Sequence, residues 1–146
     1  MRPNVMCSRG RALRRHDTLL SSDFMRRTCA VVDLIAVLIF VGIGRSVHDH
    51  GVYAGGVAST AWPFVAGLVL GWLLVTKLRR SGASPADGFI ICLVTVTVGM
   101  ILRVIAGQGT AFAFVLVALG FLGAFMIGGR VLLVGAKRLR KTGGSR

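Results

Sequence analysis

Four long runs of apolar residues, separated by short polar segments, dominate the pattern along the chain. The runs cover about residues 29–45, 60–77, 88–106 and 111–130. Each is close to the ~20 residues that an α-helix needs to cross a hydrocarbon core of about 30 Å. Because hydrocarbon offers no water to backbone amides, segments of this kind cross a bilayer as helices. The pattern therefore predicts an all-α fold, an integral membrane bundle of four transmembrane helices within residues 28–134.

The connections between the runs are short and rich in turn-forming residues. Only residues 107–110 separate the third and fourth runs, so these two helices are predicted to form an antiparallel hairpin. Trp62 and Pro63 stand near the start of the second run. Proline is tolerated in the first turn of a helix, and tryptophan is enriched at membrane–water boundaries. We therefore expect the second helix to begin close to these two residues, at the membrane surface.

The positive charge of the chain lies almost entirely on one side of the predicted bundle. The formal net charge is +13, and of the 18 Lys and Arg residues only Arg45 and Arg103 lie towards the other side. Lys and Arg are enriched in the cytoplasmic loops of membrane proteins. The distribution therefore predicts a multi-pass protein of the cell membrane with both termini in the cytoplasm.

Residues 1–27 and 135–146 form basic tails outside the predicted bundle. The first 24 residues are polar, rich in Arg and without helical periodicity, so the N-terminal tail is predicted to be disordered. Both tails are expected to contact anionic lipid headgroups, at about 1 kcal/mol per charge. Nucleic acid is not an expected partner, because no aromatic residue interleaves with the arginines. Met25, which two arginines follow, leaves open whether translation starts at Met1 or at Met25.

No catalytic or metal-binding motif stands out, so neither an enzymatic activity nor a cofactor is predicted. The three cysteines are scattered along the chain, and neither a disulfide nor a metal site is expected from them. The run His48-Asp49-His50 supplies only part of a metal coordination shell. A solvated loop is the simpler interpretation of these three residues.

Arg103 is the most informative polar residue, because it lies inside the third run, about four residues from its outer end. A charged residue at a helix centre costs about 2.5–3.5 kcal/mol on insertion scales, so such residues are rare and often functional. Away from the centre, an arginine can extend its guanidinium group to the headgroups, which lowers this cost. Two interpretations stay open: Arg103 binds an anion or substrate, or it has a structural role. Gln108 and Arg45 lie towards the same side and complete, with Asp33, the set of candidate polar site residues.

Asp33 is the one acidic residue of the first run and lies near its inner end. At 1.5 Å per residue, roughly 15 Å or more of membrane depth separate it from Arg103, so a direct ion pair between the two is not expected. Lys77 and Arg130, both near the inner boundary, match the depth of Asp33 better. A structural ion pair with one of them and a proton or cation site are the two interpretations.

Small residues recur at helical spacing in three of the four runs. In lipid, helices associate by close van der Waals packing, which small residues allow. These positions either pack the bundle tightly or provide one stripe that mediates a homodimer, and both interpretations stay open. The predicted helix-packing positions are Gly67, Gly71, Gly99, Gly120, Ala124 and Gly128.

One set of residues resembles a known family. The set comprises Asp33-Leu34, Ile43-Gly44-Arg45, Trp62-Pro63-Phe64 with Gly67 and Gly71-Trp72, and the run from Thr95 to Arg103 continued by residues 107–111. On these residues the chain resembles the prokaryotic membrane family catalogued as domain of unknown function 3054, over residues 28–134. The resemblance implies a four-helix integral membrane protein and supplies no activity.

Two functions are compatible with these features. One is a small transporter or channel subunit, working as a dimer, with Arg103 and Gln108 near an outer vestibule. The other is an accessory or assembly protein that packs against a larger membrane complex. The runs hold few polar groups to line a route for a substrate, which weighs against the first function, whereas the stripes of small residues suit both.

Overall fold

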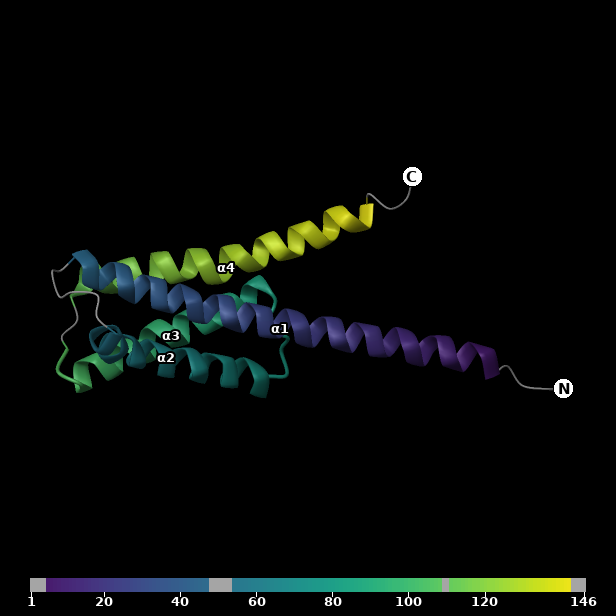
Figure 1. Cartoon of the computed structure of the whole chain (residues 1–146), viewed down its shortest axis with the longest axis horizontal. Helices are drawn as coiled ribbons and strands as arrows, with labels where there is room; N and C mark the ends of the chain where they lie inside the picture. The colour runs from purple at the N-terminus through teal and green to yellow at the C-terminus, as the bar shows by residue number, and fades with distance from the viewer. Residues whose placement is uncertain (1–4, 48–53, 109–110, 143–146) are drawn as a thin grey trace.

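The computed structural model describes residues 5–47, 54–108 and 111–142, with side chains for 23–45, 55–108 and 111–135. Four helices account for most of these residues. The helices are α1 (Val5–Val47), α2 (Ala54–Lys77), α3 (Pro85–Ile105) and α4 (Phe112–Thr142) (Figure 1). Each contains a segment that is long and apolar enough to cross a bilayer. The prediction of an all-α protein with four membrane-spanning helices is therefore confirmed.

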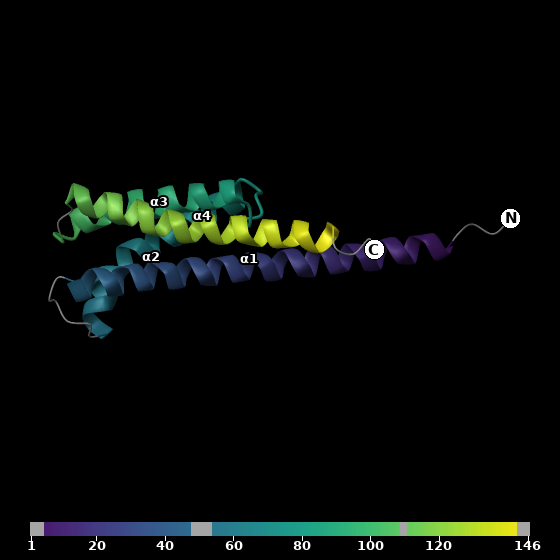
Figure 2. The same cartoon turned by 90° about the horizontal axis from the view of Figure 1, so that it is seen from above.

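The helices form an antiparallel bundle in which α1 and α3 each pack against both α2 and α4. Successive helices run in opposite directions, and both ends of the chain leave the bundle on the same side (Figures 1 and 2). We call this side the basic end, because it holds Arg26, Arg80 and Arg130. The last turn of α1 and the first turn of α4 lie at the opposite end.

Apolar side chains fill the interior of the bundle. Towards the opposite end, Phe40 of α1 lies against Phe64 of α2 and Phe114 of α4, with ring centroids 5.7 and 5.4 Å apart. Towards the basic end the core continues with Ile91 and Met126, which are fully buried. The four helices therefore share one core that runs the length of the bundle.

Three glycines let α2 and α3 approach each other closely. A Cβ at Gly67 would lie 2.7 Å from the carbonyl oxygen of Thr95, and one at Gly71 would lie 3.2 Å from the backbone of α3. On the facing helix, a Cβ at Gly99 would lie 2.7 Å from a ring carbon of Phe64. Helices in lipid gain their association energy from such close contacts. The three glycines therefore pack the bundle.

The predicted packing positions of α4 make no close contact with the other described helices. A Cβ at Gly120 or Gly128 would meet nothing within 4 Å. Ala124, which lies between them, is exposed. On α4 the predicted stripe therefore makes no close contact within the part of the chain that the structure describes.

α1 begins much earlier than the sequence analysis predicted. That analysis indicated a disordered tail, whereas the helix starts at Val5 and runs without a break into the apolar segment. Extending an existing helix avoids the cost of nucleating a new one. The Leu, Met, Arg and Ala residues of this segment also have high helix propensity. These two effects outweigh the missing periodicity.

α2 also begins earlier than predicted, so that Pro63 lies inside the helix rather than in its first turn. Proline has no N–H group and displaces the carbonyl group four residues before it, here that of Ser59. Prolines inside helices cause kinks, and the first turns of α2 are turned away from the bundle axis in Figures 1 and 2. In hydrocarbon, a carbonyl group freed in this way needs another donor.

Replacing Gly67 by Ala is expected to lower the free energy of unfolding, because the added methyl group forces α2 and α3 apart. Overpacking of this kind costs about 1–3 kcal/mol. Gly42→Ala in α1 is the matched control, since a Cβ at Gly42 meets nothing within 4 Å. Both changes raise helix propensity by the same amount. The difference between their effects on the free energy of unfolding therefore measures the contact between α2 and α3. The measurement is reversible unfolding by sodium dodecyl sulfate in mixed micelles, and equal effects at both positions would contradict the close contact.

Candidate functional site

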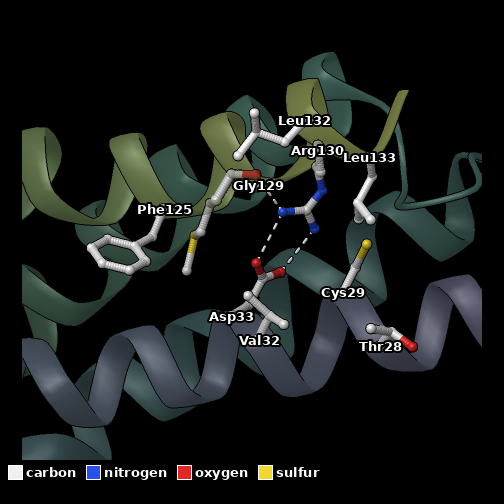
Figure 3. Close-up of a pocket in the computed structure, with 10 residues that line it drawn as sticks. Thr28, Cys29, Val32, Asp33, Phe125, Gly129, Arg130, Leu132 and Leu133 are labelled. Atoms are coloured by element: carbon white, nitrogen blue, oxygen red, sulfur yellow. Dashed lines mark hydrogen bonds and ion pairs between the residues drawn. The ribbon is translucent and has the colours of Figure 1, made fainter. Parts of the chain in front are cut away.

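Apart from the buried Thr95 of α3, the polar side chains inside the bundle gather in two groups, one at each end. At the basic end, Asp33 of α1 and Arg130 of α4 face each other (Figure 3). Arg130 Nη1 donates to Asp33 Oδ1 at 2.9 Å, and Nη2 donates to Oδ2 at 2.8 Å. The two side chains are 2% and 1% exposed. They therefore form a bidentate ion pair that is almost completely buried.

The ion pair has further partners in the other elements. Trp72 Nε1 of α2 donates to Asp33 Oδ2 at 3.1 Å. Arg130 Nε donates to the carbonyl oxygen of Gly82 at 2.9 Å, and Nη1 donates to that of Met126 at 2.6 Å. The guanidinium group also lies over the Trp72 ring, 5.7 Å from its centre. One buried pair thus joins α1, α2, α4 and the connection between α2 and α3.

Two glycines make room for this arrangement. Gly82 has a positive φ of 74°, and a Cβ there would overlap the Trp72 ring. Gly88 of α3 lies against Arg130, because a Cβ there would be 2.8 Å from Arg130 Cδ and 2.6 Å from the carbonyl oxygen of Met126. Glycine alone tolerates both the left-handed backbone and the close approach. The ion pair therefore depends on the α2–α3 connection as well as on its own two residues.

Asp87 stabilises the α2–α3 connection, which contains Gly82. Its carboxylate accepts a hydrogen bond from the Gly82 N–H at 3.0 Å and forms an ion pair with Arg80. The Ser84 hydroxyl accepts from the Asp87 N–H at 3.1 Å, and the Asp87 side chain accepts from the Ser84 N–H in return. This capping box places a negative charge at the helix N-terminus, where the macrodipole favours it. The polar network at the basic end thus extends into the first turn of α3.

At the opposite end, Gln108 supplies the hydrogen bond that Pro63 removes. Gln108 Nε2 donates at 2.8 Å to the carbonyl oxygen of Ser59, which the proline deprives of its helical donor. Arg103 Nη1 donates to Gln108 Oε1 at 3.1 Å, and its guanidinium group lies 5.0 Å from the centre of the Phe114 ring. Arg103 is therefore part of a group that closes the opposite end of the bundle.

The structure divides the predicted polar set between the two ends. Arg103 and Gln108 bind each other, and Arg45 Nη1 donates to the Thr60 hydroxyl at 3.0 Å at the same end. Asp33 lies at the basic end and is not part of this group.

The partner of Asp33 is one of the two that its depth suggested. Arg130 is buried, whereas Lys77, the other candidate, is exposed at the end of α2. The run His48-Asp49-His50 lies outside the described residues, so the predicted solvated loop is not placed.

A pocket of about 420 Å³ opens between α1 and α4 beside the ion pair (Figure 3). Its lining is almost wholly apolar, although Asp33 and Arg130 contribute to it, because these two side chains bind each other. The residues that line it are Thr28, Cys29, Val32, Asp33, Phe125, Met126, Gly129, Arg130, Leu132 and Leu133.

The polar groups described above hold helices together. Within residues 5–47, 54–108 and 111–142, no group of three or more His, Cys, Asp or Glu lies close enough to hold a metal ion. The buried carboxylates of Asp33 and Asp87 are each bound to an arginine.

The sequence did not identify five residues of the basic end, which are Trp72, Gly82, Ser84, Asp87 and Gly88. The spacing of Ser84 and Asp87 before an apolar run is a capping-box signal that could have identified Asp87. Trp72 and Gly82 carry no such signal, because their roles arise only when α1 and α4 meet α2.

Comparison with known proteins places the chain in a family. Residues 30–133 match the family model described as "Protein of unknown function (DUF3054)". No curated protein and no solved structure matches the chain.

Replacing either member of the buried ion pair alone is expected to cost about 3–5 kcal/mol of unfolding free energy, because the partner charge is left unpaired. The single variants are Asp33→Leu and Arg130→Met. The double variant is expected to cost less than either single change, since it leaves no buried charge. Reversible unfolding in mixed micelles measures all three, and a double variant as unstable as the two single changes added together would contradict the proposed coupling.

The effect of replacing Gln108 is expected to depend on Pro63. Gln108→Leu removes the hydrogen bond to the exposed Ser59, which is expected to cost about 0.5–1.5 kcal/mol. In a Pro63→Ala background the helix supplies its own N–H to this carbonyl, so the same change is expected to cost less. Unfolding of the four proteins in a double-mutant cycle checks this, and strictly additive effects would rule out the link between the two residues.

Proposed function

The chain belongs to the DUF3054 family of proteins of unknown function, and we propose that it works as a membrane-embedded accessory or assembly protein. In this proposal the outward face of α4 packs against another membrane-spanning helix, in a second copy of the chain or in a larger complex. The observation that carries the proposal is the set of small residues on this face, because among the described residues a Cβ at Gly120 or Gly128 would meet nothing within 4 Å.

α4 is the least buried of the four helices. Only 17% of its most apolar stretch is buried in the bundle, against 33% for each of the other three helices. Its buried side includes Leu122 and Met126. At 3.6 residues per turn, Gly120 and Ala124 fall on the other side of the helix, and both are exposed.

Small residues on an exposed helix face favour contact with a helix over contact with lipid. Lipid chains are as apolar as Leu side chains, so association in a bilayer depends on how closely two backbones approach. Within this chain, the contact between α2 and α3 is closest where Gly67 and Gly99 stand. The same residue type at Gly120 provides the matching surface for a helix outside the bundle.

A transporter or channel built from one copy is less well supported. Apolar side chains such as Phe64, Ile91 and Leu122 fill the interior. The charged groups of Arg103 and Arg130 are bound by partners of the same chain. A transport route would therefore require a second copy beside the first.

The charge distribution supports an orientation for the proposed protein. With the basic end in the cytoplasm, nearly all Lys and Arg residues obey the positive-inside tendency of membrane proteins. Both basic tails then contact the anionic headgroups of a cell membrane.

Photo-crosslinking in native membranes tests the α4 surface. Benzoylphenylalanine at Ala124 is expected to give a discrete crosslinked product, whereas the same group at Leu73, an exposed residue of α2, is not. A crosslinked product with twice the mass of the chain identifies a second copy as the partner. A product with one other defined mass identifies a different subunit. Gly120→Leu is expected to reduce the product about tenfold, as a loss of about 1.4 kcal/mol in association would.

Two results would overturn the proposal. One is a crosslinking yield at Ala124 no higher than that at Leu73. The other is a product whose yield Gly120→Leu leaves unchanged, because such a product would not depend on close packing against α4.

A further inference from the structure

We propose that the pocket between α1 and α4 binds one acyl chain of an anionic phospholipid, whose headgroup contacts basic residues at the basic end. The site lies on the side of α4 that carries Phe125 and Gly129, away from the exposed Gly120 and Ala124. The proposal is therefore independent of the packing function proposed above, and either can fail alone.

The size of the pocket suits a single lipid chain. Its volume of about 420 Å³ lies within the roughly 300–1,000 Å³ typical of ligand pockets. On α4 its lining runs from Phe125 to Leu133, which is about 12 Å at 1.5 Å per residue. One leaflet of a bilayer has about 15 Å of hydrocarbon, half of the ~30 Å core. A helix from another protein would need a seam along much more of this core, so the short recess favours a chain.

The chemistry of the lining requires an apolar occupant. Val32 of α1 and Phe125, Leu132 and Leu133 of α4 form its walls, and Figure 3 shows these side chains around the space beside Arg130. The charges in the wall do not attract a polar ligand, because Arg130 and Asp33 saturate each other. Hydrocarbon loses nothing by entering such a space, whereas a polar group would lose its own hydrogen bonds.

In the sequence of both helices, basic residues adjoin the residues that line the pocket. Arg26 and Arg27 directly precede Thr28, the first lining residue of α1. On α4, Lys137 and Arg138 follow within two turns of Leu133, the last lining residue. Basic pockets between membrane-spanning helices bind anionic headgroups. Charge complementarity therefore favours an anionic lipid over a zwitterionic one.

Tryptophan fluorescence can report on the pocket, because Trp72 lies against its polar wall. The Trp72 side chain donates to Asp33, and Arg130 lies over its ring. In a Trp62→Phe background, Trp72 is the one remaining tryptophan. The protein is reconstituted with brominated phosphatidylglycerol or brominated phosphatidylcholine, since bromine in the chains quenches nearby tryptophan. We expect the anionic lipid to quench at about fivefold lower mole fraction, the effect of one basic contact.

Variants that fill the pocket distinguish lipid binding at this site from a general attraction of anionic lipids to the basic tails. Gly129→Leu adds a side chain where a Cβ meets nothing within 4 Å, and Val32→Phe narrows the pocket from the facing wall. Both variants keep every basic residue, and both are expected to abolish the lipid preference. Gly135→Leu is the matched control on α4, because its Cβ also meets nothing within 4 Å and it does not line the pocket.

Three results would overturn the proposal, each obtained with protein whose circular dichroism matches the wild type. The first is equal quenching by the two lipids in the wild type. The second is no quenching by either lipid, which would mean that the pocket is covered by protein. The third is a preference that survives both Gly129→Leu and Val32→Phe, which would assign it to the surface charge alone.

Discussion

The buried ion pair between Asp33 and Arg130 is the interaction on which the rest of the structure depends. Two charges taken out of water are tolerated only when their mutual attraction is joined by hydrogen bonds to the remaining donors and acceptors. Here those bonds come from Trp72 and from the carbonyl oxygen of Gly82, in parts of the chain far from either charge. The α2–α3 connection must therefore present one carbonyl group at one place, and the contacts of Asp87 hold it there.

At the opposite end of the bundle, a polar group also needs a hydrogen-bond partner, but for a different reason. There the group to be satisfied is a backbone carbonyl, at Ser59, which Pro63 has deprived of its helical hydrogen bond. Gln108 donates to it and Arg103 donates to Gln108, so that a bent helix and a charged residue stabilise each other at this end of the bundle. Each end of the bundle is thus closed by polar contacts, and the length between them is packed by apolar side chains. This division explains how so few polar residues suffice to specify four helices.

The helices could be predicted from the sequence because membrane spans depend on composition and length alone. Depth along the membrane also narrowed the partner of Asp33 to two residues, of which Arg130 is the one observed. The contacts of Trp72 could not be predicted, because they require the relative rotation of three helices. For a related reason the sequence left two roles open for the α4 glycines: spacing places Gly120 on a stripe, yet only the assembled bundle decides whether that stripe faces inward.

The polar residues of the two ends are committed to contacts within the chain. The two surfaces proposed above to contact other molecules both lie on α4. Arg130 binds α4 to α1 and to the α2–α3 connection, and Gly88 allows α3 to lie directly against it. An occupant of the pocket and a helix on the face of Gly120 could influence each other only by moving α4. Such a movement would break the bidentate pair and leave two charges buried without partners, a cost of about 3–5 kcal/mol. The ion pair therefore keeps the two surfaces of α4 independent of each other.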